Sequence, residues 1–139
     1  MSKLQPFHLA IPVKELDATR TFYNTTLNCQ EGRSSDRWVD LDFYGHQLVL
    51  HIADHAGQDN HNSVDGHEVP IPHFGVVLTM EDWEDLADRL KKHGMQFIVD
   101  PYIRFKGEAG EQATMFFKDP SGNSLEFKAF QNIDQLFAT

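Results

Sequence analysis

Four residues with metal-binding side chains occupy matching places in the sequence. His8, His51 and His73 each stand in a short strand-like run, and Glu126 stands in another. Because successive side chains of a β-strand point to opposite faces, each of the four lies opposite the main apolar face of its run. Imidazole nitrogens and a carboxylate suit divalent iron, manganese, zinc or nickel, and two histidines with one carboxylate form the open Fe(II) site of non-haem enzymes. The pattern predicts a metal site if the sheets curve toward each other. The alternative is four ordinary polar residues on strands.

These residues belong to two similar halves of the chain. Residues 6–13 (PFHLAIPV) resemble residues 72–78 (PHFGVVL), and His73 follows His8 by 65 residues, nearly half of the 139-residue chain. A run with helical spacing follows each segment. The repeat predicts a single α+β domain over residues 1–139, built from two βαβββ modules at about 5–53 and 72–130 with a linker at 54–71.

Periodicity predicts the individual elements. Helical spacing indicates one helix over 15–27, and a second that begins at Thr79, ends at Gly94 and buries a face of four residues. That face consists of Trp83, Leu86, Ala87 and Leu90. Strands are expected at 7–13, 38–43, 47–52, 73–79, 95–106, 112–118 and 124–130. Residues 53–71 are rich in Asp, Asn, Gly and His and lack periodicity, which predicts a loop with exposed histidines.

Composition restricts the class of protein. Apolar residues make up 40% of the chain and charged residues 24%, which is typical of a soluble globular domain. The net charge of −9 argues against nucleic acid or an anionic membrane as a partner, because both attract cationic surfaces. The one cysteine, Cys29, excludes an intrachain disulfide, and no apolar run is long enough for a signal peptide or a membrane span. The expected location is the cytoplasm.

Several motifs carry a family resemblance. They are residues 7–13 (FHLAIPV), residues 21–23 (TFY) with Leu27, residues 72–76 (PHFGV) and residues 117–127 (FKDPSGNSLEF). In these the chain resembles the vicinal oxygen chelate superfamily, which includes glyoxalase I, extradiol dioxygenases, methylmalonyl-CoA epimerase and the fosfomycin and bleomycin resistance proteins. The resemblance covers nearly the whole chain. It implies paired βαβββ modules in a curved mixed-sheet half-barrel or barrel around a metal.

The resemblance also implies residue roles. His8, His73 and Glu126 fall on the metal-ligand positions of the extradiol enzymes, which makes Fe(II) the expected ion, with Mn, Zn or Ni as alternatives. His51 falls where glyoxalase I has a fourth, carboxylate ligand and where extradiol enzymes have a catalytic histidine. We predict an acid–base role for His51, because a fourth protein ligand would block a position that oxygen chemistry needs. Ligation and simple lining of the site are the alternatives.

The predicted function is that of a metal-dependent enzyme, an Fe(II) extradiol-type dioxygenase acting on a small catechol-like substrate. Residues 31–35 (EGRSS), 43–49 (FYGHQLV) and 101–105 (PYIRF) carry a likeness to small predicted extradiol-type dioxygenases. Residues 114–117 (TMFF) lack the tyrosine that helps extradiol enzymes hold substrate. Those enzymes also carry a further histidine in the second module, and the one candidate for it, His93, stands at the end of the helix. A glyoxalase- or epimerase-like lyase or isomerase, or a non-catalytic resistance-type protein that sequesters small molecules, is the alternative.

Two further expectations concern partners. Superfamily members commonly dimerise, so the resemblance implies a homodimer whose ligands come from one chain or from two. Arg104 and Lys106 are candidates for binding an anionic substrate, because arginine clamps carboxylates bidentately. Ordinary surface charge is the alternative for both.

Overall fold

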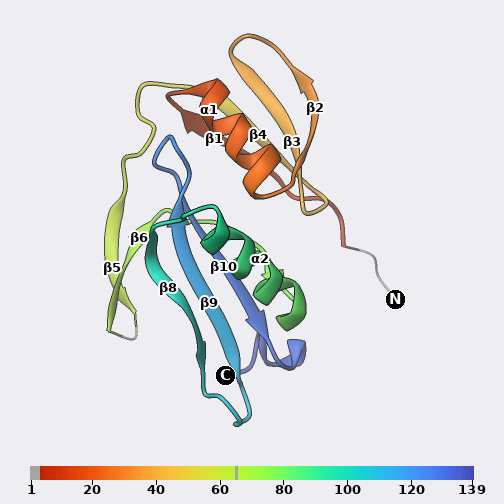
Figure 1. The fold of residues 1–139 in the computed structure, drawn as a ribbon, viewed down its shortest axis with the longest axis vertical. Coiled ribbons are helices and arrows are strands. Elements are labelled where there is room, and N and C mark those ends of the chain that lie inside the picture. The colour runs from red at the N-terminus through yellow and green to blue at the C-terminus, as the bar shows by residue number, and fades with distance from the viewer. Residues whose placement is uncertain (1–3, 65) are drawn as a thin grey trace. The chain divides into compact units, whose positions relative to one another are not determined.

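The computed structural model describes residues 4–64 and 66–139, which divide into two compact units (Figure 1). The first unit comprises the chain up to Gln58 together with residues 119–123. The second unit comprises residues 59–118 and 124–139. Among the helices of the described residues, none has the length and apolarity needed to cross a membrane.

The first unit contains a four-stranded mixed sheet. Its strands are β1 (His8–Val13), β2 (Gln30–Ser34), β3 (Trp38–Phe43) and β4 (His46–Ile52), in the spatial order β1-β4-β3-β2. β1 runs parallel to β4, and the other pairs are antiparallel. The connection between β1 and β2 forms α1 (Leu16–Thr21), which continues into the π-helical segment η1 (Phe22–Thr26). Apolar side chains of one sheet face and of the helix are buried, among them Val13, Leu16, Tyr23, Val39, Leu41, Leu48 and Leu50.

The second unit repeats this topology. β7 (Val77–Leu78), α2 (Met80–Lys92), β8 (Phe97–Arg104), β9 (Gln112–Lys118) and β10 (Ser124–Phe130) form a sheet in the order β7-β10-β9-β8. β7 runs parallel to β10, as β1 does to β4. The unit also holds the hairpin of β5 (Asn60–Val64) and β6 (His67–Ile71), and the 3₁₀ turn η2 (Ile133–Gln135).

The α+β class with two βαβββ repeats is confirmed. Each unit places a helix after its first strand and pairs that strand, in parallel, with its last. Strands 112–118 and 124–130 have the predicted bounds. Within the described part of the chain, neither four-stranded sheet closes into a barrel.

The second helix follows its sequence pattern closely. The Thr79 side chain accepts a hydrogen bond from the Asp82 amide at 3.1 Å, which satisfies one of the free donors at the helix start. Trp83, Leu86, Ala87 and Leu90 are buried, and the Trp83 indole donates to the Phe127 carbonyl at 3.0 Å. The helix therefore covers the apolar face of β10.

Two predicted elements are wrong in part. Residues 53–71 were expected to be a loop, but they contain the β5–β6 hairpin. Every residue of β5 is exposed, so no apolar alternation marked it; the Asp65-Gly66 pair is the one hairpin signal in this stretch, and Asp65 lies outside the described residues. The strand expected over 73–79 is reduced to β7 and an isolated bridge between Phe74 and Leu125.

The segment Asp119–Asn123 (DPSGN) is a structural turn of the first unit. The buried Asp119 carboxylate accepts hydrogen bonds from the Tyr23 hydroxyl at 2.8 Å and from the amides of Ser121 and Asn123 at 2.9 and 3.0 Å. Burial raises the pKa of Asp119, and these donors act in the opposite direction. Gly122 adopts a φ of 89°, which favours glycine. Asp119 therefore ties the backbone of this turn to Tyr23 of the helical segment η1.

Candidate metal centre

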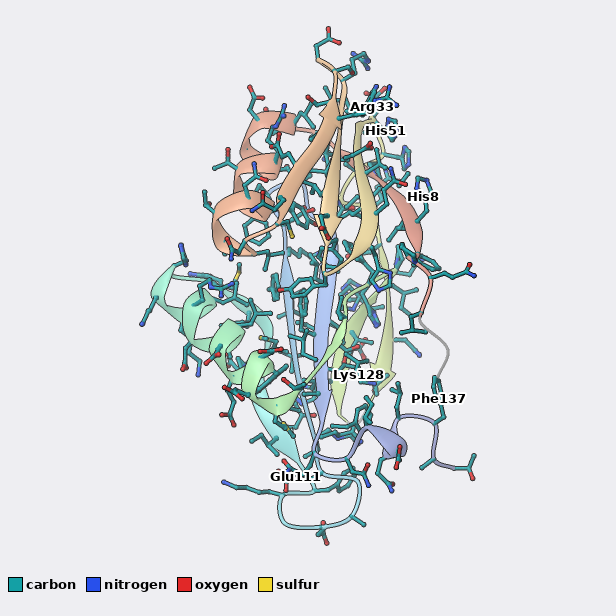
Figure 2. The ribbon with its side chains drawn as sticks, turned by 90° about the vertical axis from the view of Figure 1, so that its right-hand side faces the viewer. His8, Arg33, His51, Glu111, Lys128 and Phe137 are labelled. Carbon is teal, nitrogen blue, oxygen red and sulfur yellow. The ribbon has the colours of Figure 1, made fainter. Side chains whose placement is uncertain are left out.

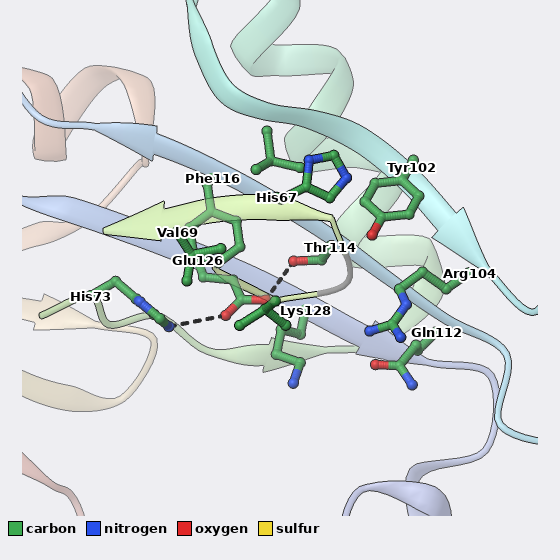
Figure 3. A pocket seen from close by; sticks show the side chains of 12 residues that line it. His67, Val69, His73, Tyr102, Arg104, Gln112, Thr114, Phe116, Glu126 and Lys128 are labelled. Carbon is green, nitrogen blue, oxygen red and sulfur yellow. Dashed lines mark hydrogen bonds and ion pairs between the residues drawn. The ribbon is translucent and has the colours of Figure 1, made fainter. Parts of the chain in front are cut away.

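One histidine and one carboxylate meet in the second unit. His73 precedes the bridge between Phe74 and Leu125, and Glu126 follows Leu125 on β10. The His73 Nε2 atom lies 3.2 Å from Glu126 Oε1, and neither side chain is fully exposed (Figure 3). The structure therefore brings together two of the three predicted metal ligands.

Hydrogen bonds fix both side chains of this pair. His73 Nδ1 lies 2.7 Å from the Pro70 carbonyl oxygen, which can only accept, so Nδ1 carries a proton. The Thr114 hydroxyl donates to Glu126 Oε2 at 2.5 Å. When the imidazole is neutral, Nε2 carries a lone pair that faces Glu126 Oε1. A cation between these two acceptor atoms would stabilise their close approach. The donor set and its outer hydrogen bonds fit a divalent metal ion.

Gly75 allows the close approach that forms the pair. The Glu126 amide donates to the Phe74 carbonyl at 2.8 Å, which draws the segment around Gly75 against β10. A Cβ atom at Gly75 would lie 1.6 Å from the Glu126 carbonyl oxygen, a distance that backbone atoms cannot accommodate. The glycine of the PHFGV motif is therefore needed for the pairing that sets His73 beside Glu126.

His8 and His51, the other two predicted site histidines, lie in the first unit, on one face of its sheet (Figure 2). His8 pairs with Gln47 on β4, and its Nδ1 lies 2.8 Å from the Gln47 side-chain oxygen. His51 lies four residues beyond Gln47, about 13 Å along the strand at 3.3 Å per residue. Metal–nitrogen bonds are only about 2.0–2.1 Å long, so this separation disfavours a shared ion between His8 and His51.

Counting along the strands shows which residue of the first unit corresponds to Glu126. The bridge between Phe74 and Leu125 places His73 opposite Ser124, and Glu126 stands two residues after Ser124 on β10. In the first unit, His8 is opposite Gln47 on β4. Two positions beyond Gln47 stands Val49, which is 5% exposed. The first unit therefore offers a histidine but no carboxylate at the corresponding place. The resemblance assigned the position of the fourth, carboxylate ligand to His51, but the strand register places Val49 there, two residues before His51.

The predicted ligands do not come together as a complete set among the described residues. Among residues 4–64 and 66–139, no three His, Cys, Asp or Glu side chains gather as a metal site. His93 caps the end of α2, as its place in the sequence suggests. Cys29 is buried, which raises the pKa of its thiol to about 12 and excludes a thiolate nucleophile at neutral pH. The roles of His8, His51, His73 and Glu126 stay predictions.

A pocket of about 160 Å³ adjoins the His73–Glu126 pair. Its walls come from β8, β9, β10 and the β5–β6 hairpin, all within the second unit. Sequence reasoning missed four of its polar residues, namely His67, Tyr102, Gln112 and Lys128. His67 was assigned to an exposed loop; it is exposed, but it lies on β6, and its ring lies 5.6 Å from that of Tyr102. Lys106 does not line this pocket, whereas Arg104 does.

Comparison with family models decides the family. The model of the Glyoxalase/Bleomycin resistance protein/Dioxygenase superfamily matches residues 5–127. The chain belongs to this superfamily. The resemblance drawn from the sequence motifs is thereby confirmed, and both four-stranded sheets lie within the matched range apart from the last residues of β10.

Solved structures agree with this assignment. A glyoxalase/bleomycin resistance protein/dioxygenase from Alicyclobacillus acidocaldarius is 34% identical, with 96% of each chain covered and a TM-score of 0.78. A lactoylglutathione lyase from Agrobacterium tumefaciens is 14% identical over 100% of each chain, with a TM-score of 0.66. The fosfomycin resistance protein FosX from Listeria monocytogenes, complexed with Mn(II) and sulfate, is 21% identical over 97% of this chain and 94% of that one, with a TM-score of 0.66. The last two show the fold alone. No curated protein sequence matched the chain.

Proposed function

We propose that the chain is a metal-dependent enzyme whose ion is held by His8, His73 and Glu126. The observation that carries the proposal is the His73–Glu126 pair, whose Nε2 and Oε1 atoms face each other at 3.2 Å. His8 supplies a third donor of the same kind, with Nδ1 engaged by Gln47 and Nε2 left for a metal. Mn(II) in the structure of FosX, which shares the fold, supports a divalent ion.

The count of ligands favours oxygen chemistry within this superfamily. Val49 stands where a second carboxylate would complete a four-ligand site, so two histidines and one carboxylate remain. This set leaves coordination positions open and is the pattern of non-haem Fe(II) oxygenases. We therefore propose an Fe(II) dioxygenase that acts on a small oxygen-chelating substrate of the catechol type. When bound, the ion supplies Lewis-acid and one-electron chemistry.

The protein's own residues supply position and proton transfer. Thr114 and Pro70 hold Glu126 and His73 in fixed orientations through their hydrogen bonds. We propose that His51 accepts and returns a substrate proton, since histidine is the side chain that most often serves as a general acid or base. Its 13 Å offset from His8 along the sheet suits a residue that acts on the substrate rather than on the ion.

We also propose a homodimer, because His8 and His51 are exposed on the sheet face of the first unit and a second copy offers another His73–Glu126 pair. Light scattering at micromolar concentration is expected to give twice the monomer mass of 15.9 kDa. A mass equal to the monomer would contradict the dimer without affecting a metal site built from one chain.

Metal analysis tests the proposed centre. The chain, stripped of metal and reloaded with Fe(II), is expected to hold one ion, and His8→Ala, His73→Ala and Glu126→Ala are each expected to lose it. His93→Ala is the matched control, because His93 is an exposed histidine at the end of α2. Retention of no Fe(II), Mn(II) or Zn(II) by the wild type would overturn the proposal.

Oxygen consumption separates the dioxygenase from its alternatives. The Fe(II)-loaded chain is expected to take up oxygen with catechols and to yield ring-opened products. A metal-loaded chain that isomerises or adds to its substrate without consuming oxygen would instead support the glyoxalase- or epimerase-like reaction.

A further inference from the structure

The pocket beside His73 and Glu126 is built in three rows across the sheet of the second unit. The first row contains Val99, Phe116 and Glu126, the second Tyr102, Thr114 and Lys128, and the third Arg104 and Gln112. Successive rows are two residues apart along the strands, which is about 7 Å. The pocket therefore has a metal-binding end at the first row and a different end at the third (Figure 3).

A β-bulge turns the cationic side chain of the third row inward. The pairing of β8 with β9 shifts between Val99 and Tyr102, around the Asp100-Pro101 dipeptide. Without that shift, alternation would place Tyr102 and Arg104 on the face opposite Val99. Because of it, all three side chains line the same pocket. The bulge at Asp100-Pro101 therefore brings Tyr102 and Arg104 into the pocket.

The end distant from His73 is cationic. Arg104 lines it with the Gln112 amide beside it, and Lys128 stands one row nearer to His73 (Figure 3). Glu126 is the one carboxylate among the described lining residues, and it is engaged by His73 and Thr114. The chain carries a net charge of −9, so two cationic side chains lining one pocket do not reflect its general composition.

Beside the first row the wall of the pocket is apolar. Val69, Val99 and Phe116 form a buried cluster, and the Tyr102 side chain packs against it. The volume of about 160 Å³ is close to that of a cavity of roughly 150 Å³ known to take up benzene. The pocket therefore fits one ring or an apolar body of similar size.

We propose that this pocket binds a single-ring carboxylate, with the carboxylate held by Arg104 and Lys128 and the ring packed against Phe116. That the other end of the ring binds the metal ion rests on the proposed function. Arginine and lysine both form charge-assisted hydrogen bonds with carboxylates, and arginine can do so bidentately. The substrate class is accordingly a chelating aromatic acid rather than a neutral catechol.

Binding of benzoate and benzamide to metal-free protein tests the carboxylate site alone. The two probes have nearly the same shape and differ in charge, so calorimetry or ligand-observed NMR reports the charge preference. Wild type is expected to bind benzoate at least tenfold more tightly than benzamide. Arg104→Gln and Lys128→Met are each expected to weaken benzoate binding about ten- to a hundredfold, with little change for benzamide.

Lys106→Met is the matched control. Lys106 lies two residues after Arg104, is exposed, and does not line the pocket, so the variant removes one charge from the same region. It is expected to keep the wild-type preference for benzoate. Equal binding of both probes by wild type, or a preference that survives both pocket substitutions, would overturn the proposal. The wild-type comparison decides the matter even if a variant fails to fold.

The same assay distinguishes this proposal from the proposed function. If the metal-free chain prefers benzoate but never retains a metal, the carboxylate site stands and the metal-dependent enzyme does not. If the chain binds Fe(II) but shows no preference, the reverse holds. With both in place, Fe(II)-loaded protein is expected to bind 3,4-dihydroxybenzoate more tightly than catechol by a similar factor.

Discussion

The two units share a strand order but differ at the place where chemistry is expected. In the second unit, the histidine that precedes the first strand faces the Glu126 carboxylate on the strand alongside. In the first unit, His8 lies beside Gln47, and the position that corresponds to Glu126 holds Val49. One fold repeat thus carries a histidine–carboxylate pair, and the other carries a histidine with an amide.

This difference explains how a repeated fold can produce an asymmetric site. Two identical repeats would supply two histidines and two carboxylates, a set that fills four positions of an ion. In the proposed metal centre, a valine in place of one carboxylate would leave three donors and open positions for substrate. The next corresponding positions along the two strands also differ, since His51 in the first unit matches Lys128 in the second. One offers an acid–base group and the other a fixed charge.

The most severe test makes the second unit resemble the first. Glu126→Val removes the carboxylate of the pair and leaves the His73 Nε2 atom without its partner. We expect metal affinity to fall by more than about a hundredfold, since loss of even an outer-shell partner of a ligand costs 10–100-fold. Metal content after dialysis measures the effect. Full metal retention would show that Glu126 is not a ligand.

The second test removes His51, the proposed acid–base residue. His51→Ala is expected to leave metal content unchanged and to lower turnover by roughly 10²- to 10⁴-fold, the usual contribution of a general acid–base. Steady-state rates with the Fe(II)-loaded chain measure it. Loss of the metal would make His51 a ligand, and unchanged turnover would reduce it to a lining residue.

The third test loosens the Glu126 side chain without removing it. Thr114→Val deletes the hydroxyl that donates to Glu126 Oε2 and nearly preserves the volume. Because such outer contacts orient ligands, we expect metal affinity to fall about tenfold, while Thr114→Ser should restore it. Competition with a chelator of known affinity measures both variants. Equal affinity in all three proteins would exclude a positioning role.

Sequence patterns predicted the parts of the fold that alternate clearly. The four buried residues of α2, its Thr79 cap and the bounds of β9 and β10 follow from apolar spacing alone. The polar strand β5 could not be predicted, because backbone pairing with β6 leaves its side chains exposed and unpatterned. Local periodicity reports burial, so it fails where a strand has none.

The candidate site shows the same limit at the level of register. Strand alternation predicted that His8 and His51 both lie opposite the apolar faces of their strands. The distance between them follows from the pairing of β1 with β4, which alternation does not predict. Arg104 reached the pocket only through a bulge, whose effect on the alternation of side chains cannot be read from spacing. Strand pairing and bulges are long-range properties, and one sequence pattern does not contain them.

The smallest expected effect concerns the stability of the first unit. Glu31 on β2 accepts hydrogen bonds from Arg20 on the helix at 2.9 and 2.5 Å and from Asn24 at 2.6 Å. The Arg20 guanidinium lowers the pKa of Glu31 from 4.5 to about 2. Because both side chains are about a quarter exposed, solvent screening reduces the contribution, and we expect Glu31→Gln to cost about 1 kcal/mol at pH 7.

The stabilisation that Glu31 provides depends on pH, because the pKa of its carboxyl is lowered in the folded state. A carboxylate whose pKa is lower in the folded than in the unfolded state stabilises the fold above the unfolded pKa, and the contribution disappears as pH falls toward the folded pKa. The difference between wild type and Glu31→Gln should therefore be constant above about pH 5 and shrink between pH 4.5 and about 2. Urea unfolding at several pH values measures it, with Glu84→Gln on the exposed face of α2 as the control. A difference that persists unchanged at pH 2 would mean that Glu31 acts through packing and neutral hydrogen bonds, and not through its charge.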